Sequence, residues 1–523
     1  MVQREKLKKP LRDLIAGKDF IYGLEAVTTR GLLHAEGERV HRFATEAMET
    51  DLFDFISITD NPGGNPHLAP DTIGRTLLHQ GYNVNIHITC KDRNRNSLES
   101  HAWRLASEGF TNILALTGDY PAEGYQGTGK PVFDIDSVGL LKMYSALSNG
   151  HEVAVPGKTR TARLSKTDFL LSATVSPFKK HESEYLTQYF KMEKKIRAGA
   201  AYFIIQIGYD ARKWSELLEY ARLNQIRTPF IANIYLLTRG VAQLFHDGKI
   251  AGCVVTPRLL DLVRKAADSP DKGKGFFIEF AARQIAIAHG LGFHGCYLGG
   301  VHNIKDILAI REKAGQFSPD DWKEFYGEMS FPQPGEFYLF KKNASGLATS
   351  EFTDGYTQSK KTIRRIMRRL CFEPPVYRLS RWVHHLAFNP KSPLHNLLKS
   401  LYRTIDGKKP LEKFFHFFEH AGKICLYGCH DCGDCSLLEI AYLCPMAKCS
   451  KNQRNGPCGG SYRGMCEVGD KRCIWYKAYN RLKPHGREKE PFEGGITITD
   501  AGLLNTSAWQ NYFLKRDHLR TRE

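Results

Sequence analysis

Short runs of consecutive apolar residues, each followed by a polar loop and a stretch with helical spacing, repeat along residues 20 to about 310. Runs that are apolar at nearly every position are typical of parallel strands, which are covered on both faces. Eight runs predict eight strands: FIYGLEAV, LFDFISITD, YNVNIHITC, TNILALTGD, DFLLSATVS, AYFIIQIGYD, TPFIANIYLLT and FHGCYLGGV. Stretches such as SLESHAWRLASEG and SEYLTQYFKMEKKIRAGA predict helices between them, and Gly109 and Gly199 fit helix ends.

Eight strand–helix units in this length match the number and size of a (β/α)8 barrel, while a doubly wound open sheet is the alternative. We therefore predict an α/β fold, a (β/α)8 TIM barrel followed by a helical linker region and a small Cys-rich metal-binding domain. The expected boundaries are 1–315 for the barrel, 316–420 for the basic, mainly helical linker and 421–523 for the Cys-rich module with its tail. We expect the tail after Lys483 to lie on the surface.

Polar residues follow directly after most of the predicted strands. Active sites of barrels form at the carboxyl ends of strands and in the loops that follow, so this distribution favours the barrel and a shared pocket. The polar strand-end residues include Glu25, Thr59, Asp60, Asn61, His87, Thr89, Asp119, Ser176 and Gln206.

Nine of the thirteen cysteines lie in one short segment: Cys425, Cys429, Cys432, Cys435, Cys444, Cys449, Cys458, Cys466 and Cys473. Thiolates at such spacing can converge on one metal. The Cys429-x2-Cys432-x2-Cys435 run is similar to the ligand run of bacterial ferredoxins, and Cys444 precedes a proline as in that motif. The segment predicts either zinc or [4Fe–4S] binding, and nine cysteines suffice for two four-ligand sites with one spare.

The remaining composition fits a soluble protein, with 42% hydrophobic and 25% charged residues. The N-terminus has no apolar core of signal length and no stretch is apolar enough to cross a membrane, so we expect a cytoplasmic protein with reduced cysteines. The net charge is +18, and fourteen basic against three acidic residues fall between Lys360 and Lys413. This basic segment indicates a solvated helix face, an acidic protein partner or a polyanionic substrate tail, with nucleic acid ranked last.

Several motifs together resemble one enzyme family. The segments ITDNPGGNPHLAPDTIG, NIHITCKDRNRNSLES, GFTNILALTGDYP and KPVFDIDSVGLL, with ATVSPF and MEKKIRAGAAYFIIQIGYD, resemble methylenetetrahydrofolate reductases, especially the short acetogen-like forms. The cysteine segment, which includes NGPCGG, looks like the zinc or iron–sulfur module of those reductases, fused here behind the barrel. The resemblance covers residues 20–310 and the cysteine segment.

This resemblance implies a flavoprotein that reduces 5,10-methylenetetrahydrofolate to 5-methyltetrahydrofolate in one-carbon metabolism and methionine biosynthesis. FAD is the implied cofactor, with FMN as the alternative. The implied electron donor is NAD(P)H or a ferredoxin-like protein. We expect no association with a membrane or a nucleic acid, and the sequence leaves the oligomeric state undecided. Two other hypotheses are a folate- or corrinoid-linked methyl-transfer protein and a non-catalytic assembly subunit of a one-carbon complex.

The resemblance also assigns roles to residues. Glu25 matches the proposed general acid, although the following residues differ from the family's usual aromatic and proline-rich sequence; Asp119 matches a catalytic aspartate that also contacts the flavin. Gln206 matches the pterin-binding glutamine, while the segment IANIYLLTRG lacks the usual aromatic substrate-stacking position. The implied flavin contacts are Thr59, His87, Leu116, Thr117, Gly118, Asp119, Lys194 and Lys195.

Overall fold

The chain forms two compact units in a computed structural model that describes residues 8–155, 157–358 and 362–522. Unit 1 comprises the described residues up to Thr353 together with Gly459–Arg463. Unit 2 comprises Asp354–Cys458 and the described residues from Gly464 onward. The three-domain division expected from the sequence stays a prediction.

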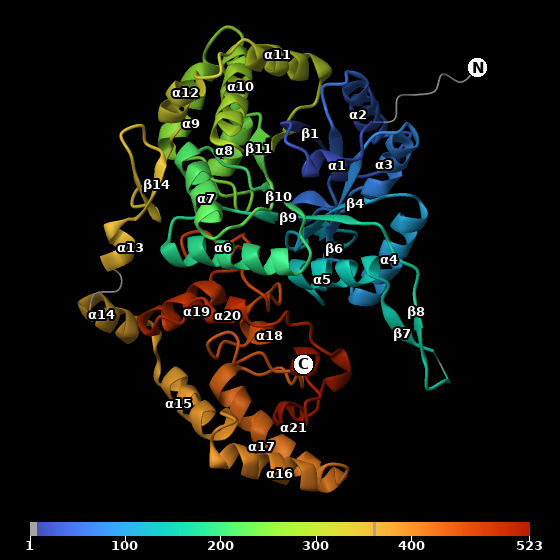
Figure 1. Cartoon of the computed structure of the whole chain (residues 1–523), viewed down its shortest axis with the longest axis vertical. Coiled ribbons are helices and arrows are strands. Elements are labelled where there is room, and N and C mark those ends of the chain that lie inside the picture. The colour runs from blue at the N-terminus through green and yellow to red at the C-terminus, as the bar shows by residue number, and fades with distance from the viewer. Residues whose placement is uncertain (1–7, 156, 359–361, 523) are drawn as a thin grey trace. The chain divides into compact units, whose positions relative to one another are not determined.

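Unit 1 contains a closed barrel of eight parallel strands (Figure 1). The strands are β1 (Ile21–Ala26), β2 (Phe55–Ile58), β3 (Val84–Thr89), β4 (Asn112–Leu116), β9 (Leu170–Val175), β10 (Tyr202–Ile205), β11 (Phe230–Tyr235) and β12 (Gly295–Gly299). Strand β1 closes the barrel, because Glu25 pairs with Ser57 on β2 while Leu24 pairs with Leu298 on β12. The predicted (β/α)8 barrel is confirmed, and the open sheet is excluded.

Helices surround the barrel because each has one apolar stripe that packs on the strands. The helices of unit 1 are α1 (Leu11–Ala16), α2 (Glu38–Glu49), α3 (Pro70–His79), α4 (Arg95–Ser107), α5 (Ser137–Ser148), α6 (Glu182–Arg197), α7 (Ala211–Leu223), α8 (Arg239–His246), α9 (Pro257–Ala267), α10 (Lys274–Leu291), α11 (Ile304–Gly315) and α12 (Trp322–Glu328). Helices α4 and α6 confirm the two helices expected from the sequence.

Apolar side chains fill the amino-terminal end of the barrel. Leu11 and Ile15 of α1 form a buried cluster with residues at strand beginnings, among them Ile21, Leu170 and Tyr202. Hairpins extend from the unit: β5 (Glu123–Gly124) with β6 (Gly127–Thr128), β7 (Glu152–Ala154) with β8 (Thr161–Arg163), and β13 (Phe340–Lys342) with β14 (Ala348–Phe352). Because the amino-terminal end of the barrel is filled, a site is expected at the carboxyl ends of the strands.

Unit 2 joins helices to a long segment with little regular structure. Its helices are α13 (Asp354–Gln358), α14 (Thr362–Phe372), α15 (Pro375–Val383), α16 (Pro393–Ile405), α17 (Lys409–Tyr427), α18 (Pro445–Lys448), α19 (Ile474–Leu482), α20 (Glu490–Glu493) and α21 (Ala508–Phe513). Between α17 and α19 the structure describes one helix, the four-residue α18. The basic segment includes α14, although its Lys360 and Lys361 lie outside the described residues.

The expectation that the tail after Lys483 lies on the surface is wrong. Phe513 is buried and belongs to an apolar cluster with Phe388 and Tyr402. Asp517 and His518 are also buried. Polar residues of the tail can leave the surface here because His518 finds carboxylate partners inside the unit. No helix among the described residues is long and apolar enough to cross a membrane.

Candidate functional site

Glu25 lies near the carboxyl end of β1, where a tyrosine from the last barrel strand meets it. The hydroxyl of Tyr297 on β12 donates a hydrogen bond to Glu25 Oε2 over 3.3 Å. Gly299, at the end of β12, leaves room for this carboxylate, because a Cβ there would stand 3.2 Å from Glu25 Oε1. Barrel closure therefore places an acidic side chain and a phenol side by side at one mouth.

The surroundings of Glu25 favour its protonated form. Burial raises the pKa of Glu25 to about 7, and the hydrogen bond from Tyr297 opposes that shift. A carboxyl group with such a pKa holds its proton through much of the neutral range and can still release it. The structure therefore equips Glu25 chemically for a general acid.

Asp119 follows β4, in a turn that requires glycine at position 118. Gly118 has a φ of 87°, and a Cβ there would stand 2.9 Å from Thr89 Cβ. The Asp119 carboxylate accepts a hydrogen bond from the Gly63 backbone N–H over 2.8 Å, which ties the β4 end to the loop after β2. The Gly-Asp pair thus fixes a carboxylate at the mouth.

Cys253 lies near both carboxylates, which places them at one mouth of the barrel. The sequence did not identify this cysteine as a site residue. Burial raises the pKa of Cys253 to about 12, and the nearby charges of Asp119 and Glu25 add to the shift. Lys179 acts in the opposite direction and lowers the pKa of the same thiol.

Gln206, the predicted pterin-binding residue, lies directly after β10. Its side-chain oxygen accepts a hydrogen bond from the Ile207 N–H over 2.9 Å.

Tyr235 is an aromatic side chain at this mouth that the sequence comparison left unassigned. It is the last residue of β11. Burial raises the pKa of Tyr235 to about 12, and the nearby charge of Glu25 adds to this shift. A Cβ on Gly299 would stand 2.9 Å from the Tyr235 ring. The segment IANIYLLTRG therefore supplies an aromatic ring close to the general-acid candidate.

The predicted flavin contacts on β2 and β3 lie inside or at the rim of the barrel. His87 Nε2 and the Ser57 hydroxyl are 2.7 Å apart, and burial lowers the pKa of His87 to about 4, which keeps the ring neutral. Asp60 stiffens the rim, because one carboxylate oxygen accepts bonds from the Thr89 N–H and hydroxyl and from Arg93. Their contact with a flavin stays a prediction.

Residues 116 and 117 and the lysine pair occupy two parts of the barrel wall. The Leu116 carbonyl accepts a bond from the Cys90 N–H, and the Thr117 hydroxyl donates to Ser137 over 3.3 Å. Lys194 and Lys195 on α6 are buried, and Lys195 donates to the Thr174 carbonyl over 2.6 Å. Burial and then Lys191 lower the pKa of Lys195 to about 7. The phosphate role of this pair stays a prediction.

The mouth also contains polar atoms that protein groups do not satisfy. Thr59 Oγ1, Ser176 Oγ and Asn233 Oδ1 are buried with no hydrogen-bond partner within the described parts of the chain. Buried polar atoms are nearly always hydrogen-bonded, so these three fit a bound ligand that carries several donors and acceptors. The residues present therefore fit a flavin.

A loop from the cysteine segment belongs to unit 1 as well. Lys179 is buried, and its ammonium donates to the backbone carbonyls of Gly459 and Ser461, the latter over 2.6 Å. A Cβ on Gly252 would stand 3.2 Å from Gln206 Nε2 and 3.3 Å from the Gly459 carbonyl oxygen. The second half of the NGPCGG motif thus lies beside the predicted pterin-binding glutamine.

In unit 2 eight of the nine clustered cysteines form two sets of four. Electrostatic effects on the thiol pKa values link Cys429, Cys432, Cys435 and Cys444, which we call group A. The same effects link Cys449, Cys458, Cys466 and Cys473, which we call group B. Cys425 is exposed on α17, and its predicted ligand role stays a prediction.

Backbone N–H groups point at several of these sulfurs. Asp431 N–H donates to Cys429 Sγ over 3.4 Å, and Gln453 N–H and Val468 N–H make similar bonds to Cys449 and Cys466. Such bonds stabilise a thiolate, which is the form that binds a metal. Burial nevertheless raises the pKa of Cys429 and Cys449, and the ligand role of both groups stays a prediction.

The spacing of the sulfurs bears on the two predicted metals. Zn–S bonds of about 2.3 Å in a tetrahedral site hold the sulfurs about 3.8 Å apart. In the described residues, potential ligand atoms gather within 4.8 Å of one another in only two groups of three or more, and neither group contains a cysteine. Within the described residues, no three sulfurs of group A or of group B are that close together.

Comparisons with known proteins agree with this architecture. A family model described as methylenetetrahydrofolate reductase matches residues 11–315, and one described as methylene-tetrahydrofolate reductase C terminal matches residues 409–500. Methylenetetrahydrofolate reductase 2 of Saccharomyces cerevisiae is 27% identical over 202 residues, which are 38% of this chain and 31% of the yeast protein. The match thus spans about a third of that relative.

Two solved structures are similar to part of this chain at low identity. An uncharacterized Clostridium thermocellum protein that binds two copies of 5-methyl-5,6,7,8-tetrahydrofolic acid has a TM-score of 0.41 and 12% identity, covering 58% of this chain and 96% of its own. Xanthomonas albilineans dihydropteroate synthase has a TM-score of 0.31 and 14% identity, covering 58% and 98%. From the family model that spans the barrel, the chain belongs to the methylenetetrahydrofolate reductase family.

Proposed function

We propose that this chain is a flavin-dependent methylenetetrahydrofolate reductase that converts 5,10-methylenetetrahydrofolate to 5-methyltetrahydrofolate. Its family membership supports an oxidoreductase of this kind. The observation that carries the proposal is the meeting of Glu25 with Tyr297 at the carboxyl end of the barrel, with Asp119 acting on the same buried Cys253. A reductase needs an acid at the substrate, and this family barrel holds a protonatable one there.

Glu25 has the proton that ring opening requires. The five-membered ring of the methylene-folate opens when a ring nitrogen is protonated, and a buried carboxyl with a pKa of about 7 can supply that proton. Tyr297 positions the carboxyl through its hydrogen bond. Gln206 binds the pterin, and the ring of Tyr235 lies near Glu25 as a wall for it.

The flavin supplies hydride-transfer chemistry when it is bound, and FAD and FMN both remain candidates. We assign its ring system to the strand ends with Thr59, His87 and Leu116–Asp119. The hydroxyl oxygen of Thr59 is buried there and has no hydrogen-bond partner among the described residues. Lys194 and Lys195 would meet its phosphates. The neutral ring of His87 and the fixed carboxylate of Asp119 would orient it.

Groups A and B each bind a [4Fe–4S] cluster in this proposal. The support is the four-and-four partition of the cysteines and sulfur spacing wider than zinc requires. Two clusters suit a reductase that receives electrons one at a time from a ferredoxin-like protein, while NAD(P)H is the alternative donor. Iron, zinc and acid-labile sulfide counted on protein purified without air decide between clusters and zinc.

The test of the reaction is a spectrum of anaerobically purified protein before and after addition of 5-methyltetrahydrofolate. We expect the visible flavin band to bleach in the wild type, and to bleach far more slowly in Glu25→Gln. Glu49→Gln, a change at an exposed glutamate of α2, is the matched control and should behave as wild type.

Two outcomes would contradict the proposal. If the bound flavin is not reduced by 5-methyltetrahydrofolate, the substrate is not a tetrahydrofolate. Folded protein with no flavin favours the methyl-transfer or assembly hypotheses.

A further inference from the structure

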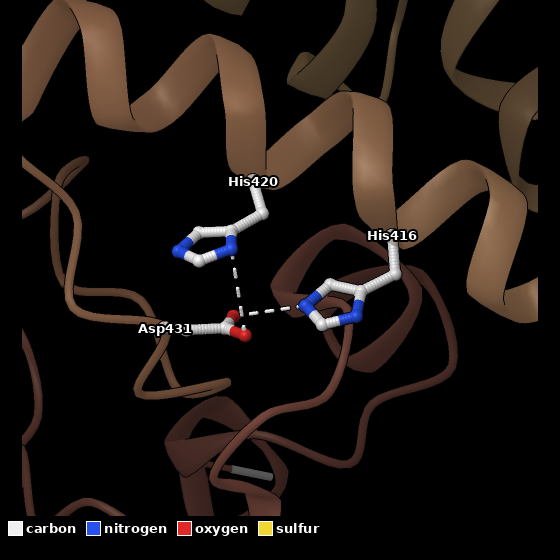
Figure 2. A group of neighbouring side chains, drawn as sticks. All are labelled: His416, His420 and Asp431. Atoms are coloured by element: carbon white, nitrogen blue, oxygen red, sulfur yellow. Dashed lines mark hydrogen bonds and ion pairs between the residues drawn. The ribbon is translucent and has the colours of Figure 1, made fainter.

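Helix α17 carries two histidines one turn apart that face an aspartate from the group A loop (Figure 2). His416 Nε2 is 2.9 Å from Asp431 Oδ1, and His420 Nδ1 is 3.8 Å from Asp431 Oδ2. The two imidazole rings are nearly parallel, with 14° between their planes. Residues four apart lie on the same helix face, so the spacing alone directs both rings to one point.

The three side chains are arranged like ligands around one ion. Their potential ligand atoms all lie within 4.8 Å of one another. Two ligand atoms bound to one ion at about 2.0–2.1 Å stand about 3 to 3.5 Å apart, a range that the two observed separations bracket. The 3.8 Å separation of His420 Nδ1 from Asp431 is too long for a hydrogen bond but leaves room for an ion.

His420 is otherwise poorly satisfied. Its Nε2 is buried with no hydrogen-bond partner among the described residues. A half-buried imidazole that approaches a carboxylate without bonding to it gains little from its position. Asp431 instead faces the other ring nitrogen, Nδ1, at 3.8 Å, so an ion between the two side chains would bond to Nδ1.

A second histidine–carboxylate group in unit 2 provides a contrast. His518 Nδ1 bonds to Asp434, and its Nε2 bonds to Glu439 over 3.0 Å. Both ring nitrogens are therefore used by protein partners, and the ring is fully buried. That group is an internal ion pair, whereas the His416–His420–Asp431 group is partly exposed; there His416 Nε2 bonds to Asp431 Oδ1, and His420 Nδ1 stays 3.8 Å from Oδ2.

We propose that His416, His420 and Asp431 bind one first-row divalent transition-metal ion, with zinc as the preferred ion, at a site separate from the cysteine groups. Two imidazoles and one carboxylate suit zinc and leave at least one position for water. The partial exposure of the three side chains, 16% to 30%, gives an ion and its water access to the site.

Such an ion would fasten the group A loop to α17. Asp431 lies between Cys429 and Cys432, and its own N–H donates to Cys429 Sγ. It also adopts a left-handed backbone conformation, with a φ of 50°, which aspartate adopts more readily than most residues with a side chain. Coordination of its carboxylate would hold this turn, and through it the cysteine ligand, in place.

The test counts metals in whole protein purified without air, dialysed briefly against chelator and then supplied with Zn²⁺ alone. Wild type should bind one zinc per chain that His416→Gln/His420→Gln lacks, with iron and acid-labile sulfide unchanged. His430→Gln is the matched control, because His430 is exposed beside Asp431, and it should retain the zinc. Zinc held by cysteines would survive all these substitutions.

X-ray absorption at the zinc edge provides a second readout on the wild type and on Asp431→Asn. Wild type should show nitrogen and oxygen ligands at about 2.0 Å, and the Asn variant should bind zinc at least tenfold more weakly. Equal zinc in wild type and the double histidine variant would overturn the proposal. Sulfur ligands at about 2.3 Å would overturn it as well, even if a variant failed to fold.

Discussion

The barrel and the cysteine-rich unit hold their chemical groups in different ways. In the barrel, Glu25 and Tyr297 are 272 residues apart, and the hydrogen-bonded pairing of β1 with β12 brings them together. In unit 2, the eight grouped cysteines lie on loops around the short α18, with little regular structure between α17 and α19. Backbone pairing thus positions the first site, whereas in our proposal the bound metals position the second.

The largest expected effect is on unit 2, which in our proposal depends on its bound metals. Cys432→Ser removes one ligand of group A, so we expect it to lose about half of the iron and the cooperative folding of unit 2, because metal binding energy is folding energy in such domains. Hydrogen exchange measures this: α19 and α21 should lose protection while barrel strands keep it. Cys425→Ser, at an exposed cysteine outside both groups, should change neither. Loss of protection in the barrel would show that the two units do not differ in this way.

Glu25→Gln should affect chemistry and leave the fold intact. Removal of a general acid costs about 10²- to 10⁴-fold in rate, and the amide has nearly the same shape as the acid. In the reductive direction the protonated carboxyl is the active form, so kcat/KM should fall as the pH rises above about 7, the pKa of Glu25. The variant should lose this decrease with pH; a variant that keeps it would assign the titration to another group.

Stability of unit 2 should depend on pH through the C-terminal tail. The hydrogen bonds and charges of Asp434 and Glu439 outweigh burial and raise the pKa of His518 to about 9. A raised pKa stabilises the fold below the unfolded value of about 6.5, and this stabilisation is lost as the pH rises through 9; it amounts to roughly 3 kcal/mol.

Hydrogen exchange of α21 near pH 6 and near pH 10 measures that loss. His518→Gln should lower the stability of unit 2 at the acidic end and remove most of the difference between the two conditions. His34→Gln, at an exposed histidine of unit 1, is the control. An unchanged pH dependence in His518→Gln would show that His518 does not cause the pH dependence of the stability of unit 2.

The difference between the units also explains what the sequence could predict. Near-continuous apolar runs predicted all eight barrel strands, because a parallel strand buried on both faces has no polar alternation. Glu25 could be named from its strand-end position, but Tyr297 and Cys253 could not, since only barrel closure places them beside it. Likewise, the sequence allowed two four-cysteine sites without showing which cysteine is left out.

The tail shows the limit of composition as a guide. The segment LKRDHLRTRE is strongly charged, and charge predicts exposure. His518 is nevertheless buried, because Asp434 and Glu439, about 80 residues earlier, accept the hydrogen bonds of its two ring nitrogens. A pairing over that distance leaves no periodic pattern in the sequence, so it appears only in the folded unit.

The smallest expected effect concerns the approach of the electron donor to unit 2. Helix α14 exposes Arg364 and Arg365 together with the apolar Ile363 and Ile366. Arg364→Glu/Arg365→Glu should slow reduction of the protein by an acidic ferredoxin-like donor by roughly tenfold at low ionic strength, and by less as salt is added, because exposed charges act mainly on the rate of encounter. Stopped-flow reduction at several salt concentrations measures this.

The matched control reverses two exposed charges on unit 1, Lys142→Glu/Lys166→Glu, and should leave the rate nearly unchanged. If both double variants slow reduction equally, only net charge matters and α14 is no docking site. If neither does, the donor is a small molecule such as NAD(P)H, whose encounter does not depend on this helix. Only a loss specific to α14 would assign donor docking to the ligand-dependent unit and leave the folate chemistry to the barrel.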